Sequence, residues 1–245
     1  MPLHADIITH STYRSGTIYH DKNRGPIANF LTLLENTTSK YFVVLGAHDI
    51  FLSNYITNAI SFLESNPDYV MVYPQSKLVD GNDSSLGYVD SDIDSHGLNV
   101  QQRMKKTAAN LSWCTCFHGV FKTDIMKKLP VLQIRGNDHL ILFAAAYYGR
   151  IHFMHTLGIL RRESRQETTL MTENRRIKSG IYLEPTNKMF DSWSVMAVEH
   201  ILFVIKRTSL TVVQKINLSF SIASIFKRRF NCSFISMAFA YAHKK

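Results

Sequence analysis

Residues 39–55, which read SKYFVVLGAHDIFLSNY, decide the fold of this chain. The apolar run 41–45 is rich in β-branched residues and ends at a glycine, which predicts a strand buried on both faces. Asp49 follows closely, and ligands of open parallel sheets bind at the carboxyl ends of strands. Asp49 is therefore the first candidate for a functional residue. The alternative is that its side chain forms a turn or caps the helix that begins near Ser53.

Strand and helix patterns alternate on both sides of this stretch. A strand, a helix and a second strand in that order imply a parallel pair, so the sequence predicts an α/β fold built on a parallel sheet. The predicted strands are 17–20, 41–45, 70–73, 113–121, 151–154 and 157–160. The predicted helices begin near residues 26, 53, 123 and 137, and two further helices cover 193–205 and 210–230.

Residues 80–97 are rich in Asp, Gly, Ser and Asn, which predicts a long mobile loop rather than a helix or strand. Loops of this length over a strand end are often substrate lids. A solvated surface excursion explains the same composition equally well.

A second acidic candidate lies at the start of a very apolar helix. Asn137 or Asp138 is predicted to cap this helix, whose residues 140–148 are apolar almost all round and which Gly149 closes. A helix without a polar face is buried, so Asp138 is expected to face the interior beside the sheet. The alternative is that Asp138 serves only as the helix cap.

The charge of the chain indicates anionic partners. Its 245 residues carry a net charge of +9 with a pI near 9.5, which favours phosphates, nucleic acid or an acidic membrane surface. Nucleic acid is not expected, because the interleaved aromatic and basic residues of single-strand binders are missing. Much of the excess lies late in the chain, at Arg161, Arg162, Arg165, Arg175, Arg176, Lys227, Arg228, Arg229, Lys244 and Lys245.

The cysteines and apolar runs bear on the compartment. Cys114, Cys116 and Cys232 are odd in number and lack the paired spacing of a metal site, so they are expected to be reduced core residues of a cytosolic protein. The first ten residues do not resemble a signal peptide. The apolar-leaning runs 216–226 and 230–242 are too short to span a bilayer.

The character of the sequence changes after Glu163. A polar stretch, 164–179, precedes two helices that are apolar on one side and basic at their ends. These helices suit either a cap packed on the domain, which is the commoner case, or attachment to an anionic membrane surface. We therefore expect two parts, a catalytic-type α/β domain over residues 1–165 and a helical extension over residues 166–245.

The order of the motifs resembles that of family 2 glycosyltransferases of the GT-A fold. The matching motifs are NRGPIANF (23–30), YFVVLGAHDIFLSNYI (41–56), VMVYPQSKLVDGNDSS (70–85), GVFKTD (119–124), GNDHLILFAAAYYGRIHFM (136–154) and ILRRE (159–163). The resemblance implies a three-layer α/β/α fold with a mostly parallel sheet and a helical C-terminal tail. Only about eighteen residues precede the first match, so the nucleotide-binding segment is expected to be shortened at its N-terminus.

The resemblance also implies roles for the two acidic candidates. The family's metal-binding motif reads Ala47-His48-Asp49 here, so Asp49 matches the position that binds a divalent cation, Mg²⁺ or Mn²⁺. His48 would lie beside the donor. Asp138 matches the family's catalytic base, which takes a proton from an acceptor hydroxyl as that hydroxyl attacks the anomeric carbon.

The resemblance extends to donor and acceptor contacts. Gly25 and Asn29 match a helix start that lies close to the donor, and Arg161 or Arg162 matches a basic pair near the diphosphate. Trp113, with the loop around Tyr88, is expected to face an acceptor sugar; Trp113 is otherwise a core residue.

These matches predict a hexosyl-type glycosyltransferase of polysaccharide biosynthesis. It would use a nucleotide-sugar donor and a glycan or lipid-linked acceptor, in the cytoplasm or peripherally on the cytoplasmic face of the membrane. Two alternatives stay open: a truncated, inactive relative, and a basic module that binds membrane surfaces.

Overall fold

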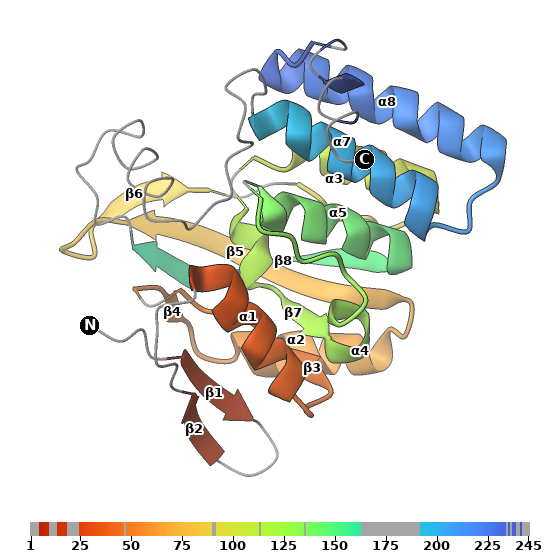
Figure 1. The fold of residues 1–245 in the computed structure, drawn as a ribbon. Helices are drawn as coiled ribbons and strands as arrows, with labels where there is room; N and C mark the ends of the chain where they lie inside the picture. Colours follow the sequence, from red (N-terminus) through yellow and green to blue (C-terminus); the bar gives the residue numbers. More distant parts are fainter. Residues whose placement is uncertain are drawn as a thin grey trace.

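A mixed sheet covered by helices on both faces forms the centre of the computed structural model (Figure 1). The structure describes residues 5–9, 14–18, 25–46, 48–89, 92–112, 114–134, 136–162, 192–233, 235, 237–238 and 241. The strands of the main sheet are β3 (Tyr41–Phe42), β4 (Ile50–Phe51), β5 (Tyr69–Val79), β6 (Ser85–Tyr88), β7 (Val120–Lys122) and β8 (Arg150–Arg162). A separate two-stranded sheet pairs β1 (Ala5–Thr9) with β2 (Arg14–Ile18).

The helices flank this sheet. They are α1 (Gly25–Asn36), α2 (Tyr55–Ser65), α3 (Val100–Asn110), α4 (Thr123–Met126), α5 (Asn137–Tyr148), α7 (Ser192–Arg207) and α8 (Val212–Phe230), with a 3-10 turn η1 (Thr115–His118) before β7. No described helix has both the length and the hydrophobicity needed to cross a bilayer.

The pairing within the sheet is mixed. Its order is β3-β7-β5-β8-β4, with β6 paired to β5. The long β5–β8 ladder is parallel, whereas every other described pairing is antiparallel. The three-layer α/β/α architecture is thus confirmed, but a mostly parallel sheet is not confirmed in the described strands.

The apolar run 41–45 does not form a strand buried on both faces. Only Tyr41–Phe42 pair, as an edge strand beside β7, and Leu45 is 42% exposed. The run leaves the sheet because the Val44 carbonyl accepts a hydrogen bond from the His118 side chain rather than from a strand. The predicted parallel partner is also wrong, since β2 pairs antiparallel with β1; residues 19–20 lie outside the described part of the chain.

Two apolar cores lie on opposite faces of the sheet. On one face α2 packs through Tyr55, Ala59 and Leu63 against sheet residues that include Val72 and Ile159. On the other face α5 is buried on nearly all sides, as its sequence predicts, because it lies between the sheet and further helices. In Figure 1, α7 and α8 lie beyond α3 and α5, away from the sheet.

The two C-terminal helices predicted at 193–205 and 210–230 are confirmed as α7 and α8. They share one core with α5, and Trp193 at the start of α7 stacks on Phe230 at the end of α8 with 4.2 Å between ring centroids. The predicted domain boundary at 165/166 falls within residues 163–191, which lie outside the described part, so that division stays a prediction.

Three other sequence expectations need correction. The acidic stretch 80–97 contains β6, and its Ile93 is fully buried with its N–H bonded to the Tyr73 hydroxyl, so this stretch is not a structureless loop. Within the predicted strand 113–121, residues 115–118 form the turn η1 instead. The two strands predicted at 151–154 and 157–160 are one strand, β8, whose register against β5 shifts between them.

All three cysteines are free thiols, as expected.

Candidate functional site

Two hydrogen bonds orient Asp49 in the turn between β3 and β4. Its N–H donates to the Gly46 carbonyl over 3.0 Å, and its Oδ1 accepts the Arg162 N–H over 3.1 Å. A Cβ at Gly46 would lie 2.5 Å from Asp49 Oδ2, so glycine is required for the carboxylate to fold back over the turn. Asp49 does not cap α2, because the residue at that N-cap is Asn54.

His118, at the end of η1, lies beside this carboxylate. Its Nδ1 donates to the Val44 carbonyl over 2.8 Å, and its Nε2 lies 3.6 Å from Asp49 Oδ2. Both side chains are nearly enclosed, with 14% of His118 and 7% of Asp49 exposed. Burial lowers the pKa of His118, although the Val44 hydrogen bond and the Asp49 charge oppose that shift. The imidazole is therefore neutral near pH 7.

The first turn of α5 carries Asp138. Gly136 precedes the helix with a left-handed φ of +73°, and a Cβ there would lie 2.2 Å from the Met196 sulfur, so only glycine fits. Asn137 Oδ1 accepts the Leu132 N–H over 2.6 Å, which fixes the approach to the helix. Asp138 itself lies one residue inside the helix, so it is not the N-cap.

The Asp138 carboxylate acts electrostatically on both Cys114 and His118. Burial, followed by the negative charge of Asp138, raises the pKa of the Cys114 thiol well above its usual range. Cys114 therefore stays protonated near pH 7. We call Asp49, His118, Cys114 and Asp138, which are related through their electrostatic effects on His118 and Cys114, the acidic cluster.

Only one residue of the basic pair on β8 belongs to the acidic cluster. Arg161 acts electrostatically on both His118 and Cys114. Successive strand residues face opposite sides, and the Arg162 guanidinium instead pairs with Asp83 over 2.6 Å. Arg162 contributes to the cluster through its backbone N–H alone, since that group orients Asp49.

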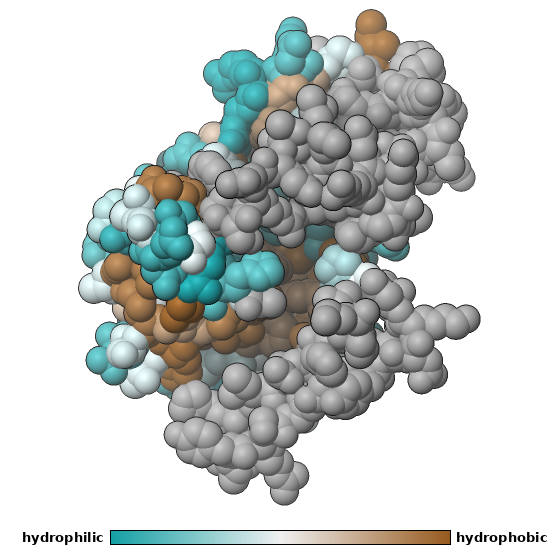
Figure 2. All heavy atoms as spheres, turned by 90° about the vertical axis from the view of Figure 1, so that its left-hand side faces the viewer, coloured by the Kyte–Doolittle hydropathy of each residue, from teal (hydrophilic) through white to brown (hydrophobic). Residues whose placement is uncertain are grey.

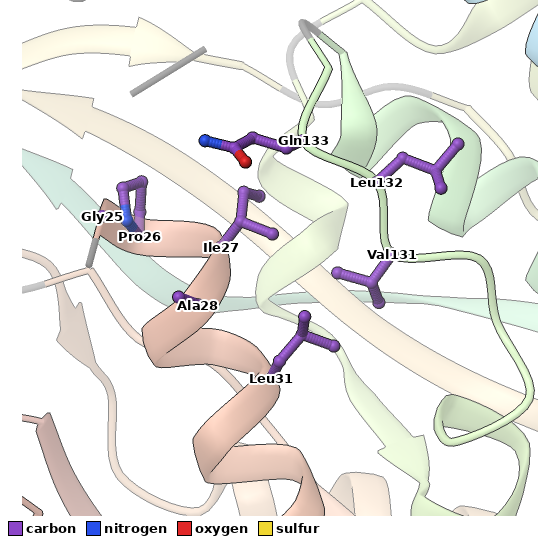
Figure 3. A pocket seen from close by; sticks show the side chains of 8 residues that line it. All are labelled: Gly25, Pro26, Ile27, Ala28, Leu31, Val131, Leu132 and Gln133. Atoms are coloured by element: carbon purple, nitrogen blue, oxygen red, sulfur yellow. The ribbon is translucent and has the colours of Figure 1, made fainter. Parts of the chain in front are cut away.

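The predicted donor residues at the start of α1 border a separate pocket of about 270 Å³. Figure 3 shows its lining: Gly25, Pro26, Ile27, Ala28 and Leu31 from α1, and Val131, Leu132 and Gln133 from the segment that leads to α5. Asn29 does not line it, but its Oδ1 is buried and has no hydrogen-bond partner within the described residues. The pocket is mostly apolar, and its lining residues 131–133 precede Asp138 by a few positions in the sequence.

Other predicted site residues have different surroundings. His48 is exposed, whereas Ala47 and Trp113 lie outside the described part. Tyr88 on β6 is 61% exposed, and further exposed apolar side chains are Leu45, Ile50 and Leu86. Figure 2 views the side on which β6 lies in Figure 1 and shows hydrophobic atoms among hydrophilic ones there.

Sequence reasoning missed His118 and Cys114. Both lie in a run that alternates enough to predict a strand, and the structure forms a 3-10 turn over residues 115–118 instead. The one signal in the sequence was a histidine directly before a glycine, Gly119. The structure shows why glycine is needed there: a Cβ would lie 2.8 Å from the Val72 carbonyl. Such a tight glycine beside a histidine marks a close approach that an ordinary strand does not need.

The acidic cluster fits a hard divalent cation that takes only one or two ligands from the protein. No group of three or more metal-binding side chains occurs among the described residues. Asp49 Oδ2, however, accepts no hydrogen bond within that part of the chain, and Mg²⁺ or Mn²⁺ at nucleotide sites often takes one or two protein ligands, with phosphate and water completing its shell.

Comparison with known proteins gives a family match and structural neighbours. The family model described as Glycosyl transferase family 2 matches residues 6–129, just over half of the chain. The crystal structure of S. aureus TarS 1-349 is 12% identical with a TM-score of 0.50, covering 85% of this chain and 53% of that one. The crystal structure of S. aureus TarS is also 12% identical, with a TM-score of 0.53 and coverages of 86% and 32%.

At this identity the structural neighbours show a shared fold alone. The chain spans about half the length of the first of these structures and about a third of the second. No curated protein matches the sequence.

Proposed function

The chain belongs to glycosyl transferase family 2, and from that premise we propose that it moves a sugar from a nucleotide-diphosphate-sugar donor to a hydroxyl of a glycan or lipid-linked acceptor. The observation that carries this proposal is the acidic cluster. Asp49 lies 3.6 Å from the His118 ring, and Asp138 lies in the first turn of the buried helix α5, in a distant part of the sequence. Glycosyl transfer needs such a pair of acidic groups, one beside the leaving diphosphate and one beside the attacking hydroxyl.

Asp138 is the proposed base. Its carboxylate takes the proton of the acceptor hydroxyl while the oxygen forms a bond to the anomeric carbon, and the bond from that carbon to the diphosphate breaks with its electron pair. The protonated Cys114 thiol orients the carboxylate from one side. Because this thiol is neutral, it leaves the negative charge on Asp138.

Asp49 and Arg161 are proposed to act on the leaving group. A divalent cation bound by Asp49, when present, supplies positive charge against the diphosphate. Arg161 carries a permanent positive charge at the acidic cluster and can contact two phosphate oxygens at once. Arg162 serves by orienting Asp49 through its N–H.

Substrate contacts are proposed on either side of the acidic cluster. Gly25 and Asn29 lie at the start of α1, near the pocket of Figure 3, and we assign them to the donor. Exposed Tyr88 on β6 offers an aromatic face of the kind on which sugar rings stack, so we assign it to the acceptor side together with Trp113.

A membrane surface is the proposed location of the acceptor. Four apolar side chains on α8 are exposed, namely Val212, Val213, Ile216 and Phe220. At helical spacing they form one stripe, which we call the α8 stripe. The basic residues Lys227 and Arg228 lie at the end of the same helix, and this combination favours binding parallel to an anionic membrane. The reaction would then take place at the cytoplasmic face.

Substitution of the proposed base tests the function. The variant Asp138→Asn should lose transfer by a factor of about 100 or more, because general-base catalysis contributes at least that much. Transfer is measured with a panel of nucleotide sugars and acceptor glycans. Binding of nucleoside diphosphates, measured by thermal melting, should persist in the variant, since Asp138 acts on the acceptor side.

The matched control is Asp124→Asn, which changes an exposed acidic residue in the first turn of another helix, α4. It should transfer at the rate of the unsubstituted chain. Full activity of Asp138→Asn would remove Asp138 as the base.

A further inference from the structure

The hydrogen bonds of His118 fix which of its ring nitrogens carries a proton. A carbonyl oxygen only accepts, so Nδ1, which lies 2.8 Å from the Val44 carbonyl, must hold a hydrogen. With its proton on Nδ1, the ring leaves Nε2 as the nitrogen that can bind a cation.

That nitrogen faces an atom that also cannot donate. Asp49 Oδ2 lies 3.6 Å from His118 Nε2, which is beyond the range of a good hydrogen bond. Two acceptors are thus held face to face in a nearly enclosed place, with no described donor between them. A bound cation satisfies both of them.

The separation suits two ligands of one ion. Neighbouring ligands of an octahedral ion with bonds of about 2.1 Å lie about 3 Å apart, so a shift of about half an ångström brings both atoms onto it. The carboxylate takes the place of a Cβ at Gly46, since such a Cβ would lie 2.5 Å from Asp49 Oδ2.

Both side chains also have the supporting contacts that metal ligands require. Histidine ligands usually donate their second ring N–H to a carbonyl or carboxylate, and ligating carboxylates are themselves hydrogen-bonded. Val44 provides the first of these contacts, and the Arg162 N–H provides the second through Asp49 Oδ1. The backbone of His118 is held as well, since its carbonyl accepts the Tyr55 hydroxyl over 3.2 Å.

We propose that His118 Nε2 and Asp49 Oδ2 are the two protein ligands of a site for a first-row transition ion, and that the nitrogen ligand makes Mn²⁺ preferred over Mg²⁺. Mg²⁺ prefers a shell of oxygens alone, and Mn²⁺ accepts an imidazole nitrogen more readily than Mg²⁺ does. The inference rests on the proposed function only for the other ligands, which would be water and the donor's diphosphate oxygens.

Electron paramagnetic resonance of the full chain with Mn²⁺ tests the site directly. Spin-echo modulation detects a nitrogen bonded to Mn²⁺, and protein labelled with ¹⁵N-histidine identifies that nitrogen as imidazole. The probes are Mn²⁺ alone and Mn²⁺ with inorganic pyrophosphate, which supplies diphosphate oxygens whatever the natural nucleotide is.

The decisive variant is His118→Asn. The asparagine amide can still donate to the Val44 carbonyl, but the variant lacks any atom at the position of Nε2. We expect it to lose the nitrogen modulation and to bind Mn²⁺ at least about tenfold more weakly, while its melting temperature without metal stays unchanged. Asp49→Asn should lose the modulation too, which keeps the test informative if His118→Asn does not fold.

Two further variants sharpen the result. His118→Gln places an amide oxygen near the lost nitrogen, so it should bind Mg²⁺ better relative to Mn²⁺ than the unsubstituted chain does. His155→Asn changes an exposed histidine of β8 and should leave the modulation intact.

The outcomes separate this inference from the proposed function. Bound Mn²⁺ without nitrogen modulation, or modulation that persists in a folded His118→Asn, would overturn the nitrogen ligand and leave glycosyl transfer untouched. Modulation that depends on His118 would support the site even if no sugar transfer were found.

Discussion

The Asp49 carboxylate depends on the absence of a side chain three residues earlier. A Cβ at Gly46 would lie 2.5 Å from Asp49 Oδ2, and the atom that must move is the end of a side chain rather than backbone. The change Gly46→Ala should therefore leave the free energy of unfolding within about 1 kcal/mol of its original value while displacing the carboxylate.

We expect Gly46→Ala to weaken metal-dependent nucleotide binding at least about tenfold, as measured by titration with a nucleoside diphosphate and Mn²⁺. Gly81→Ala is the control, because a Cβ there meets nothing within 4 Å. Equal binding by both variants would contradict the positioning role of Gly46.

The sequence predicted the site only where a local pattern marked it. Asp49 follows an apolar run and Asp138 opens an apolar helix, so each has a neighbouring signal. His118 had no sequence signal of comparable strength, because its position depends on a hydrogen bond to the Val44 carbonyl, which is far away in sequence. The choice between Arg161 and Arg162 likewise needed strand register, which only the β8 pairings supply.

At the scale of elements, Arg229 of α8 stabilises the end of α3. Its guanidinium donates to the Ala108 carbonyl over 2.6 Å and to the Leu111 carbonyl over 2.5 Å. The last carbonyls of a helix lack intrahelical partners and carry partial negative charge, so the half-buried cation of Arg229 suits them.

Arg229→Gln should lower the free energy of unfolding by about 1–3 kcal/mol, because it leaves buried carbonyls without their donors. Urea denaturation measures this difference. The neighbouring Arg228→Gln is the matched control, since Arg228 is exposed and should change stability little. An equal effect of the two variants would show that Arg229 does not tie α8 to α3.

The α8 stripe gives the second prediction at this scale. Ile216 is 49% exposed and Phe220 71% exposed, and burying both side chains in a membrane would contribute more than about 1.4 kcal/mol, which is a tenfold change in affinity. The double variant Ile216→Ser/Phe220→Ser should thus bind anionic vesicles at least about tenfold more weakly in a sedimentation assay.

Leu86→Ser is the control for this measurement, because Leu86 is 54% exposed on β6 rather than on α8. If both proteins bind vesicles equally, the stripe does not contact the membrane. If the stripe instead buries itself in a second copy, the double variant will change the oligomeric state in solution.

Element types followed the strength of the periodic signal. α7 and α8 were predicted from a long one-sided apolar pattern, and α5 from a long run that is apolar almost all round between a cap and a glycine. The strand prediction for residues 41–45 was wrong because pairing partners, rather than composition, decide where a short strand ends. Here the Val44 carbonyl bonds to the His118 side chain.

The whole molecule contains a buried histidine pair that links α5 and α7. His139 Nδ1 lies 2.9 Å from His200 Nε2, and His200 Nδ1 donates to the Met196 carbonyl over 2.7 Å. Burial lowers the pKa of His200 to about 4 and that of His139 well below its usual value, with His200 and Arg229 adding to the latter shift. Both rings are neutral in the folded state near pH 7.

Stability should therefore fall as the pH falls from about 6.5 towards 4, because the unfolded chain then binds protons that the folded chain does not. Each histidine contributes about 1.4 kcal/mol per pH unit within this window. Above about pH 6.5 the two histidines no longer change the free energy of unfolding with pH, because they are neutral in both the folded and the unfolded chain. Urea denaturation at pH 7 and pH 5 measures the difference, and NMR of labelled histidine should show a neutral His200 at pH 5.

The variant His200→Gln removes one of the two titrating rings and also the effect of His200 on the pKa of His139. Its stability should depend less steeply on pH than that of the unsubstituted chain. Identical slopes would mean that His200 is protonated in the folded state.

The long ladder between β5 and β8 determines which parts of the molecule open to solvent. Its amides lie in the centre of the sheet between two helix layers, so they should exchange with deuterium only through global unfolding. β3 and β4 have two residues each and lie at the sheet edges, so their amides should exchange through local opening. The frame that carries Arg161 is then nearly immobile, while the turn that carries Asp49 fluctuates. Donor binding should accordingly slow exchange around residues 43–49 and leave β8 unchanged.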